Sequence, residues 1–502
     1  MSTPLQEIEH FVVVMLENRS FDHMLGFLYP SGAPRGQPFE GLTGKESNPS
    51  GKGPAAPVFK IQAKDPHPYF MPGANPGEGY INTNSQLFGS RVQDPTGTPA
   101  NQGFVSNFAY TLNWESGQKN MVMPGTTPAK IMGMYTPEML PVLSGLAKGY
   151  AVCDHWYSSA PTETFPNRAF VAMATSQGFV SDKSRSLFNA PSIYTALAKA
   201  GQTWAIYGYN APPLTRGSVA DIASAPASNF GEFTDFQQAV KQGTLASYVF
   251  LEPEWSSKGN SQHPNYDVAL GEQFLHDIYY TLYGSPIWQK TLLVITYDEH
   301  GGCYDHVPPP GGAMPPDNSP GELGFDFTRF GVRVPTVLVS PLIAAGTVYR
   351  ASGATPFDHS SILATVEKRY GLQALTARDK TAPSFEGVLS LAQARSDDPL
   401  QGVAVPASKG APKKAAGVNH LVQALVDSAG RLPVSDQAGN GHHHEVPAIQ
   451  DEDAALDYVR ARYKAYDGKQ AVLAYTPGKK RKPPSKKKTG KRTTRLKRRT
   501  GR

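Results

Sequence analysis

The chain has 502 residues, of which 39% are hydrophobic, so it can bury one large core or two to three ordinary domains. Its two cysteines, Cys153 and Cys303, exclude a disulfide framework and a cysteine-based zinc site, and we expect both to be free, buried thiols. The net charge of +6 is unevenly distributed. Lys479–Arg502 carries 14 Lys or Arg and no acid, so 6 minus 14 leaves a charge of −8 on the rest.

The sequence shows neither a secretory signal nor a membrane span. The first residues lack the basic region of a signal peptide, and the apolar run at residues 10–16 is too short to be its hydrophobic core. No apolar run reaches the ~20 residues that cross a bilayer. We therefore expect a cytoplasmic protein or one exported by a non-Sec route, with peripheral membrane association as a further option.

The chain opens with a pattern that predicts a buried central strand. Residues 10–16 are almost all apolar and several are β-branched, and the run stops at Glu17-Asn18. A helix is expected directly afterwards. Residues 30–130 are rich in Gly, Pro, Asn and Ser, which predicts long loops that form a lid or pocket wall rather than a folded domain.

Two threonines lie just before the next predicted helix, where a hydroxyl can meet a bound anion. The sequence PTETFPNR predicts a helix over 167–175, with Pro166 suited to its first position. Thr162 and Thr164 then lie at or just before a helix N-terminus, where free N–H groups and the helix dipole attract an anion such as phosphate. Simple capping by threonine is the alternative. The guanidinium of Arg168, whose shape suits phosphate, favours anion binding.

The other predicted elements alternate between strands and helices. Strands are expected at residues 150–157, 203–207, 247–251, 292–295 and 334–340. Helices are expected at residues 137–148, 272–283, 359–369 and 386–395. This alternation predicts a doubly wound α/β fold, with a mostly parallel central sheet and helices on both faces.

The strand at 292–295 is followed by the densest group of polar residues in the chain. Asp298, Glu299 and His300 come first, then two glycines, then Asp305-His306. Ligands bind at the carboxyl ends of strands in such sheets, and carboxylates and imidazoles supply cation ligands and acid–base groups. Glycine lets the backbone approach a bound group closely. An ordinary surface turn is the alternative.

The C-terminal part divides by composition. We expect a catalytic domain at 1–400, a linker and helical appendage at 401–477, and a disordered tail at 478–502. The appendage should contain helices at about 419–429 and 451–466. His442-His443-His444 lies between them, and we favour a solvated loop over a metal site. The basic tail would bind anionic lipid headgroups, bind nucleic acid, or act as a solubilising extension, and composition does not separate these partners.

Five motifs stand in a fixed order along residues 8–375. They are ENRSFDH, CDHWYSS with PTETFPNR, EPEW followed by HP, TYDEHGGCYDHVPPP, and FDHSSIL. Together they resemble the phosphoesterase family of bacterial phospholipases C, plant non-specific phospholipases C and acid phosphatases. That family belongs with the alkaline-phosphatase-like hydrolases. Each motif alone is weak, whereas all five in order are specific.

The resemblance implies a metal-dependent hydrolase with a covalent intermediate. Glu17 and Asn18 match the first metal-binding pair, and Asp298 and Glu299 match the second. Thr164 matches the nucleophile, with Thr162 as a second candidate. Oxygen ligands suit Ca, Mg or Mn, and Zn is not excluded.

The remaining implied residues surround the phosphate. His263, His306 and His359 match histidines that line the phosphate or assist the leaving group. Asn167 matches a residue that holds a phosphate oxygen, with Arg168 in support.

One position departs from the family pattern, because Glu78 stands where a histidine is expected. This difference puts the handling of the leaving group in doubt. The resemblance implies a phospholipase C that releases diacylglycerol and a phosphorylated headgroup. The alternatives are an acid phosphatase on the same scaffold and a membrane- or nucleic-acid-binding protein that acts through its basic tail.

Overall fold

The structure is a computed structural model that describes residues 3–51, 53–117, 122–182, 188–411, 417–432, 434 and 449–468. His442-His443-His444 and the basic tail lie outside the described residues, so the predictions for them stay predictions. In the part of the chain that is described, no helix has both the length and the apolar character needed to cross a membrane.

An eight-stranded sheet forms the centre of the molecule. Its strands are β1 (His10–Leu16), β6 (Ala151–Val152), β8 (Trp204–Gly208), β9 (Phe230–Glu232), β10 (Tyr248–Leu251), β11 (Thr291–Tyr297), β12 (Val337–Val339) and β13 (Thr347–Val348). They are arranged in the order β13-β6-β12-β11-β1-β10-β8-β9. β12 runs antiparallel to β11 and β6, and the other pairings are parallel. The predicted mostly parallel α/β sheet is therefore confirmed.

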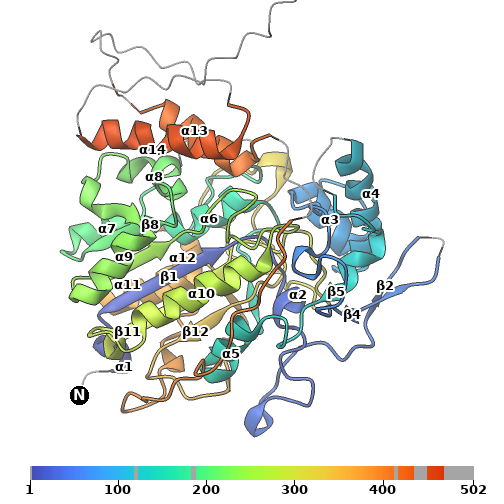
Figure 1. The fold of residues 1–502 in the computed structure, drawn as a ribbon, viewed down its shortest axis with the longest axis horizontal. Coiled ribbons are helices and arrows are strands. Elements are labelled where there is room, and N and C mark those ends of the chain that lie inside the picture. The colour runs from blue at the N-terminus through green and yellow to red at the C-terminus, as the bar shows by residue number, and fades with distance from the viewer. Residues whose placement is uncertain are drawn as a thin grey trace, which may run out of the picture.

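Helices cover both faces of this sheet (Figure 1). One face carries α5 (Pro141–Gly149), α9 (Phe233–Gln242) and α10 (Val268–Leu282), and the other carries α6 (Thr164–Met173), α7 (Ile193–Lys199), α11 (Ser360–Tyr370) and α12 (Ala377–Thr381). Because both faces are covered, Phe11 to Leu16 of β1 are all fully buried. This burial explains why the strand is an unbroken apolar run instead of an alternating one.

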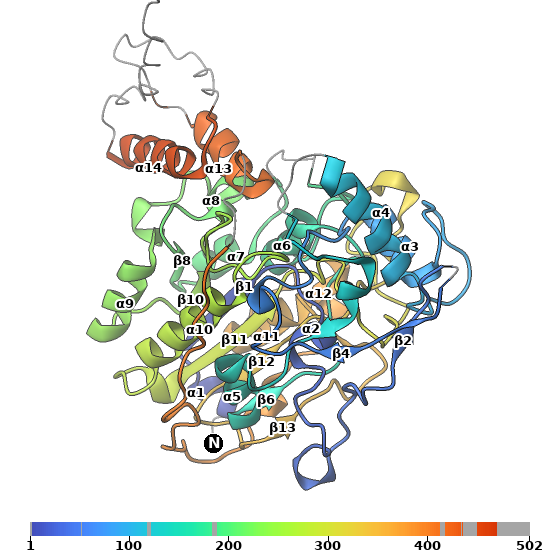
Figure 2. The ribbon, with the colours of Figure 1, turned by 45° about the vertical axis from the view of Figure 1, so that its right-hand side comes forward.

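The prediction of long loops over residues 30–130 was wrong where two helices form, and the predicted lid role stays a prediction. The segment contains α3 (Tyr80–Phe88), α4 (Phe104–Gly117) and the short strands β2 (Ser47–Asn48), β3 (Ala56–Pro57) and β4 (Phe59–Lys60). Leu87, Phe104 and Phe108 pack in a small apolar cluster of their own. The Gly- and Pro-rich connections hid this short periodicity. The segment lies beside α2 (Phe21–Leu25), beyond the carboxyl end of β1 (Figure 2).

The helix predicted at 386–395 was also wrong. The described chain has only a short 3-10 turn there, at Glu386–Val388. The residues after this turn bond to a different segment: Leu391 N donates to Leu342 O at 3.0 Å, and Arg395 N donates to Pro341 O at 2.9 Å. Tertiary hydrogen bonds thus replace the helical ones.

The C-terminal helices α13 (His420–Gly430) and α14 (Glu452–Gly468) lie against each other and over α8 (Leu214–Ser218) (Figures 1 and 2). Leu421, Leu425 and Val459 belong to the same apolar core as the central sheet. The domain boundaries predicted from the sequence stay predictions, but these two helices share the main core.

Candidate active site

The register of the central strands brings two predicted site segments together. β1 and β11 are paired in parallel up to Leu16 and Tyr297, so Glu17 and Asp298 follow at the same edge of the sheet. Asn18 N donates to Asp298 Oδ1 at 3.0 Å. The carboxyl ends of neighbouring parallel strands are the usual location of an α/β active site.

Asn18 lies at the centre of the contacts between these segments. Its backbone is left-handed, with φ of 59°, a conformation that is uncommon outside glycine. Its side chain faces two groups: Nδ2 donates to Glu78 Oε2 at 2.9 Å, and Oδ1 accepts from Thr164 Oγ1 at 3.4 Å. Gly301 packs so closely that a Cβ there would lie 2.1 Å from Asn18 O. The turn therefore holds Asn18 between Thr164 and Glu78.

Thr164 begins α6, which starts three residues earlier than the predicted helix at 167. Its hydroxyl faces Asn18, whereas the hydroxyl of Thr162 donates to Val180 O. Asn167 shapes the turn before the helix: Oδ1 accepts from Ala160 N at 3.0 Å, and Nδ2 donates to Thr162 O at 3.0 Å. Of the two threonines, Thr164 is the one whose hydroxyl faces Asn18.

The carboxylates at the strand ends include buried oxygens that lack donors. Among the described residues, no partner at hydrogen-bonding geometry meets either oxygen of Glu17 or Oε1 of Glu299, and both side chains are fully buried. Burial, and then nearby carboxylates, raises the pKa of both groups well above the ordinary value. Oε2 of Glu299 accepts from Gly301 N at 2.7 Å. Because the remaining buried oxygens without donors are costly, this oxygen-rich set fits a divalent cation.

Arg168, on α6, bonds to one of these carboxylates and to the end of β1. Its Nε donates to Asp298 Oδ2 at 3.0 Å, and its Nη2 donates to the carbonyls of Met15 and Leu16 at 3.1 Å. Its guanidinium also lies 4.5 Å from the ring centroid of Trp255. Only Nη1 has no hydrogen-bond partner among the described residues. Arg168 therefore ties α6 to the end of β1.

Two of the predicted histidines lie at this edge of the sheet. His359 Nε2 donates to Asp298 O at 2.6 Å and is fully buried, so it positions the backbone of a carboxylate. His263 Nδ1 donates to Pro264 O at 3.0 Å, which leaves Nε2 as the acceptor, 3.7 Å from Glu78 Oε2. Burial lowers the pKa of His263 to about 3. Its imidazole is therefore neutral.

Arg19 holds the loop that carries His263. It is fully buried, and its Nε and Nη2 donate to the carbonyls of Gln262 and His263 at 2.6 and 3.0 Å. Its Nη1 donates to Met71 O at 2.6 Å. Arg19, which directly follows Glu17-Asn18, thus fixes both the loop that carries His263 and the segment that carries Met71.

The third predicted histidine, His306, belongs to a separate cluster. Its Nδ1 lies 2.6 Å from Asp22 Oδ2, and Asp22, Asp305 and His306 have ligand atoms within 4.8 Å of one another. This compact group has the composition of a metal site. However, Arg333 donates to Asp22 and Asp305 at 2.9 Å each, so the two buried carboxylates already have a cation. We interpret the cluster as a structural ion network.

Sequence reasoning missed three residues that are linked to the start of α6. Glu163 is the N-cap residue of α6, and Asp182 Oδ1 accepts from Phe165 N at 2.8 Å. His420, the first residue of α13, places Nε2 3.3 Å from Asp182 Oδ2. Burial raises the pKa of Glu163 to about 8. The ETF sequence hinted at Glu163, but no local signal indicates that Asp182 and His420 meet there.

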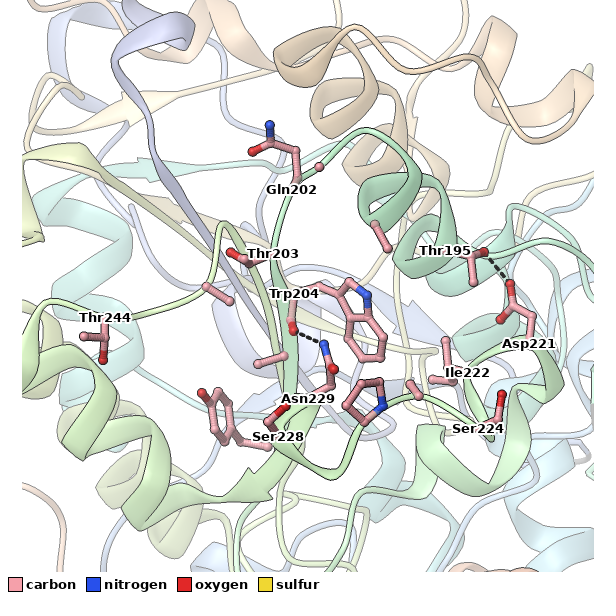
Figure 3. Close-up of a pocket in the computed structure, with 17 residues that line it drawn as sticks. Thr195, Gln202, Thr203, Trp204, Asp221, Ile222, Ser224, Ser228, Asn229 and Thr244 are labelled. Carbon is pink, nitrogen blue, oxygen red and sulfur yellow. Dashed lines mark hydrogen bonds between the residues drawn. The ribbon is translucent and has the colours of Figure 1, made fainter. Parts of the chain in front are cut away.

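A pocket of about 700 Å³ lies elsewhere, beside β8 and α7 (Figure 3). Trp204 and Asn229 line it, and Thr195 Oγ1 donates to Asp221 Oδ2 at 2.6 Å on its wall. Its lining residues, all within the described chain, include no histidine, glutamate, lysine or arginine. This composition offers little acid–base chemistry, in contrast to the edge that carries Thr164.

Comparisons with known proteins agree with the motifs. The model of the phosphoesterase family matches residues 8–373. The chain is 38% identical over 395 residues to non-specific phospholipase C1 of Arabidopsis thaliana, covering 76% of this chain and 70% of that protein. It is 36% identical to non-specific phospholipase C6 of the same plant, covering 87% and 81%. Phospholipase C A of Mycobacterium tuberculosis (strain ATCC 25618 / H37Rv) is 28% identical, covering 73% and 74%.

Solved structures give weaker matches. A phosphonate monoester hydrolase from Silicibacter pomeroyi aligns with a TM-score of 0.31 and 15% identity, covering 52% of this chain and 73% of that chain. The lipoteichoic acid synthase LtaP from Listeria monocytogenes aligns with a TM-score of 0.31 and 12% identity, covering 67% and 88%. Both overlaps are partial.

Proposed function

The chain belongs to the phosphoesterase family and is a phosphoric ester hydrolase, and from this premise we propose that it is a phospholipase C. Its substrate would be a phospholipid, cleaved into diacylglycerol and a phosphorylated headgroup. One observation supports this proposal most directly. The hydroxyl of Thr164 lies 3.4 Å from Oδ1 of Asn18, the residue that follows Glu17, whose buried carboxylate oxygens have no hydrogen-bond partner among the described residues. The relatives named phospholipase C cover most of the chain and support the choice of substrate.

We assign a divalent cation to Glu17, Asn18, Asp298 and Glu299. When bound, such an ion supplies positive charge that offsets the phosphate and favours the ionised threonine hydroxyl. The oxygen donors suit Mg, Ca or Mn best, and Zn is the borderline alternative. Asp298 is held for this role from two sides, by Arg168 Nε and by the backbone N–H of Asn18.

Thr164 is the nucleophile in this proposal. Its oxygen attacks phosphorus, the bond from phosphorus to the diacylglycerol oxygen breaks, and the headgroup phosphate remains on Thr164 as a covalent diester. Water then attacks phosphorus, which releases the phosphorylated headgroup and restores the hydroxyl. Splitting the displacement into two steps lowers each barrier. Asn18 Oδ1, which accepts the threonine hydrogen bond, orients the hydroxyl before the attack.

His263 is the group best suited to move the proton. Its Nδ1–H bond to Pro264 O fixes the tautomer, so Nε2 is free to accept a proton. Because its pKa is about 3, it would hold a proton only in passing: it would take the proton of Thr164 as the bond to phosphorus forms, pass it at once to the diacylglycerol alkoxide, and in the second step pass a proton from the attacking water to the Thr164 oxygen. His359 would act through Asp298, whose backbone it holds. Asn167 and Arg168 would support the phosphate indirectly, through the start of α6 and through Asp298.

A phosphomonoesterase is the second candidate, and Glu78 argues against it. A phosphomonoester carries between one and two negative charges near neutral pH, whereas a diester carries one. Glu78 Oε2 lies 2.9 Å from Asn18 Nδ2, near the expected phosphate position, and burial raises the pKa of Glu78 to about 7, so it carries a negative charge above that pH. Repulsion between like charges therefore disfavours the monoester relative to the diester.

The basic segment Lys479–Arg502 supports contact with an anionic lipid surface. Each Lys or Arg near such a surface contributes about 1 kcal/mol, which would bring the enzyme to its substrate. Nucleic acid is the competing partner, because its phosphates attract the same side chains. Co-sedimentation with phosphatidylserine vesicles, in competition with RNA, separates the two. Tighter binding to RNA than to the vesicles would contradict the lipid assignment.

The proposal is tested with phosphatidylcholine vesicles and the full-length protein. We expect diacylglycerol release, loss of turnover on chelation, and slower turnover of p-nitrophenyl phosphate. Thr164→Ala should lower kcat by about 10³-fold or more while the protein stays folded. Thr162→Ala is the matched control and should keep most of its activity, because its hydroxyl bonds to Val180 O. An active Thr164→Ala enzyme would refute the nucleophile assignment.

A further inference from the structure

His420 reaches the candidate active site from the C-terminal helix α13. Its Nε2 lies 3.3 Å from Asp182 Oδ2, and its ring centroid lies 6.3 Å from that of His263. About a third of the side chain, 34%, is exposed, so the imidazole borders the site without being sealed in the core. No motif of the sequence predicted a contribution from this helix.

Asp182 connects His420 to both neighbours of Thr164. Its Oδ1 accepts from Phe165 N at 2.8 Å, and its own N–H donates to Glu163 Oε2 at 2.5 Å. Asp182 therefore contacts both residues that flank Thr164: its carboxylate holds the backbone N–H of Phe165, and its backbone N–H holds the side chain of Glu163. A cation beside the other carboxylate oxygen stabilises the charge that strengthens the bond to Phe165 N.

The beginning of α13 is fixed in place by further contacts. Asn419 caps the helix, because its Oδ1 accepts from Leu421 N at 3.0 Å and from Val422 N at 2.9 Å. Asn419 Nδ2 donates to Trp255 O at 2.7 Å, and the ring of Trp255 contacts the guanidinium of Arg168. Contacts that lead through Trp255 to Arg168 therefore fix the position of His420.

The charges around His420 favour an imidazolium. Glu17, Glu78, Glu163 and Asp182 surround it, and the nearby cation Arg168 is already paired with Asp298. Burial lowers the pKa of His420, but contact with Asp182 and the charges of Glu78 and Glu17 outweigh it and raise the pKa to about 9. The histidine therefore supplies positive charge in a region crowded with carboxylates.

We propose that His420 is a positioning residue for the hydrolysis: through Asp182 it fixes the start of α6 that carries Thr164. This inference rests on the proposed function. It makes the C-terminal helices part of the catalytic unit, because His420 lies on α13, outside residues 1–400.

The test uses full-length His420→Gln, which removes the charge, and His420→Lys, which restores a charge at the same position. His420→Gln should lower kcat on phosphatidylcholine vesicles about tenfold, with a smaller change in KM, because the nucleophile is misplaced. His420→Lys should recover part of this loss. His276→Gln is the matched control: it changes a partly exposed histidine on α10 that contacts Asp277 and should match wild type. The thermal unfolding midpoint of each variant is measured in parallel.

A double-mutant cycle with Asp182 tests the route of this effect. If His420 acts through Asp182, the loss caused by His420→Gln should shrink in an Asp182→Asn background, because the ion pair between the two side chains is already lost there. Additive effects would overturn that part of the inference. A folded His420→Gln enzyme with wild-type kcat would overturn the positioning role. An inactive wild-type protein would instead refute the proposed function, so the two failures are distinguishable.

Discussion

Replacing Gly301 by alanine should damage both stability and turnover, and the structure gives the size of each effect. Gly301 has φ of +61°, where an L-residue costs roughly 1–2 kcal/mol. Its Cβ would also lie 2.1 Å from Asn18 O, whereas real Cβ contacts stay beyond 3.0 Å. The backbone of Asn18 must therefore move by about 1 Å. Relieving such overpacking typically costs a further ~1–3 kcal/mol.

That displacement falls on the residue that orients the nucleophile. Asn18 Oδ1 accepts from Thr164 Oγ1, and Asn18 N donates to Asp298 Oδ1. A shift of about 1 Å at such a position can cost up to about 10²-fold in rate. We therefore expect Gly301→Ala to lose about 2–5 kcal/mol of unfolding free energy and about 10²-fold in kcat.

Gly243→Ala provides the matched control. Gly243 has φ of +66°, almost the same as Gly301, but nothing lies within 4 Å of a Cβ built there. It should lose only the conformational ~1–2 kcal/mol and keep full activity. The assays are urea unfolding and diacylglycerol release from phosphatidylcholine vesicles. Equal losses in the two variants, or a fully active Gly301→Ala enzyme, would refute the idea that Gly301 is needed for contact with Asn18.

Three further predictions follow from the buried charges. Arg333→Met should lower the free energy of unfolding, measured with urea, by about 3–5 kcal/mol, because it leaves two buried aspartates without their cation. A loss below about 1 kcal/mol would contradict the ion-network interpretation. Glu17→Gln and Glu299→Gln should weaken Mn²⁺ binding in calorimetry by about tenfold or more, whereas Asp22→Asn should not, and the reverse pattern would place the ion at the Asp22 cluster. Burial and then Arg19 hold the pKa of His23 well below its usual value, so its contribution to stability is complete above pH ~6.5 and is lost as the pH falls, by up to about 1.4 kcal/mol per unit. His23→Phe should reduce the slope of unfolding free energy against pH, measured by urea unfolding at several pH values. An unchanged slope would contradict the role assigned to His23.

The sequence was sufficient where local pattern and sheet geometry act together. The apolar runs before Glu17 and Asp298 predict two strand ends, and parallel pairing then places both residues at one edge. Thr164 was identified by its position before PNR, and the structure directs its hydroxyl at Asn18. In each case a short segment carries both the structural signal and the chemical group.

Contacts between distant segments could not be predicted in the same way. His420 meets Asp182 only because α13 packs over α8 and Asn419 bonds to Trp255, and none of these contacts leaves a periodic signal. His306 shows the converse. It stands in a catalytic-looking motif, yet its partner is Asp22, beside Arg333. Motif chemistry alone does not show which partner a buried histidine finds.

The central claim is that the Thr164 oxygen becomes covalently phosphorylated at the edge shared by β1 and β11. Acid quenching of the full-length enzyme during turnover of phosphatidylcholine, followed by peptide mapping, tests this claim most directly. We predict a headgroup phosphate on the peptide that contains Thr164, attached to that residue and absent from Thr164→Ala. A modification on Thr162, or rapid turnover with no modified peptide, would contradict the claim.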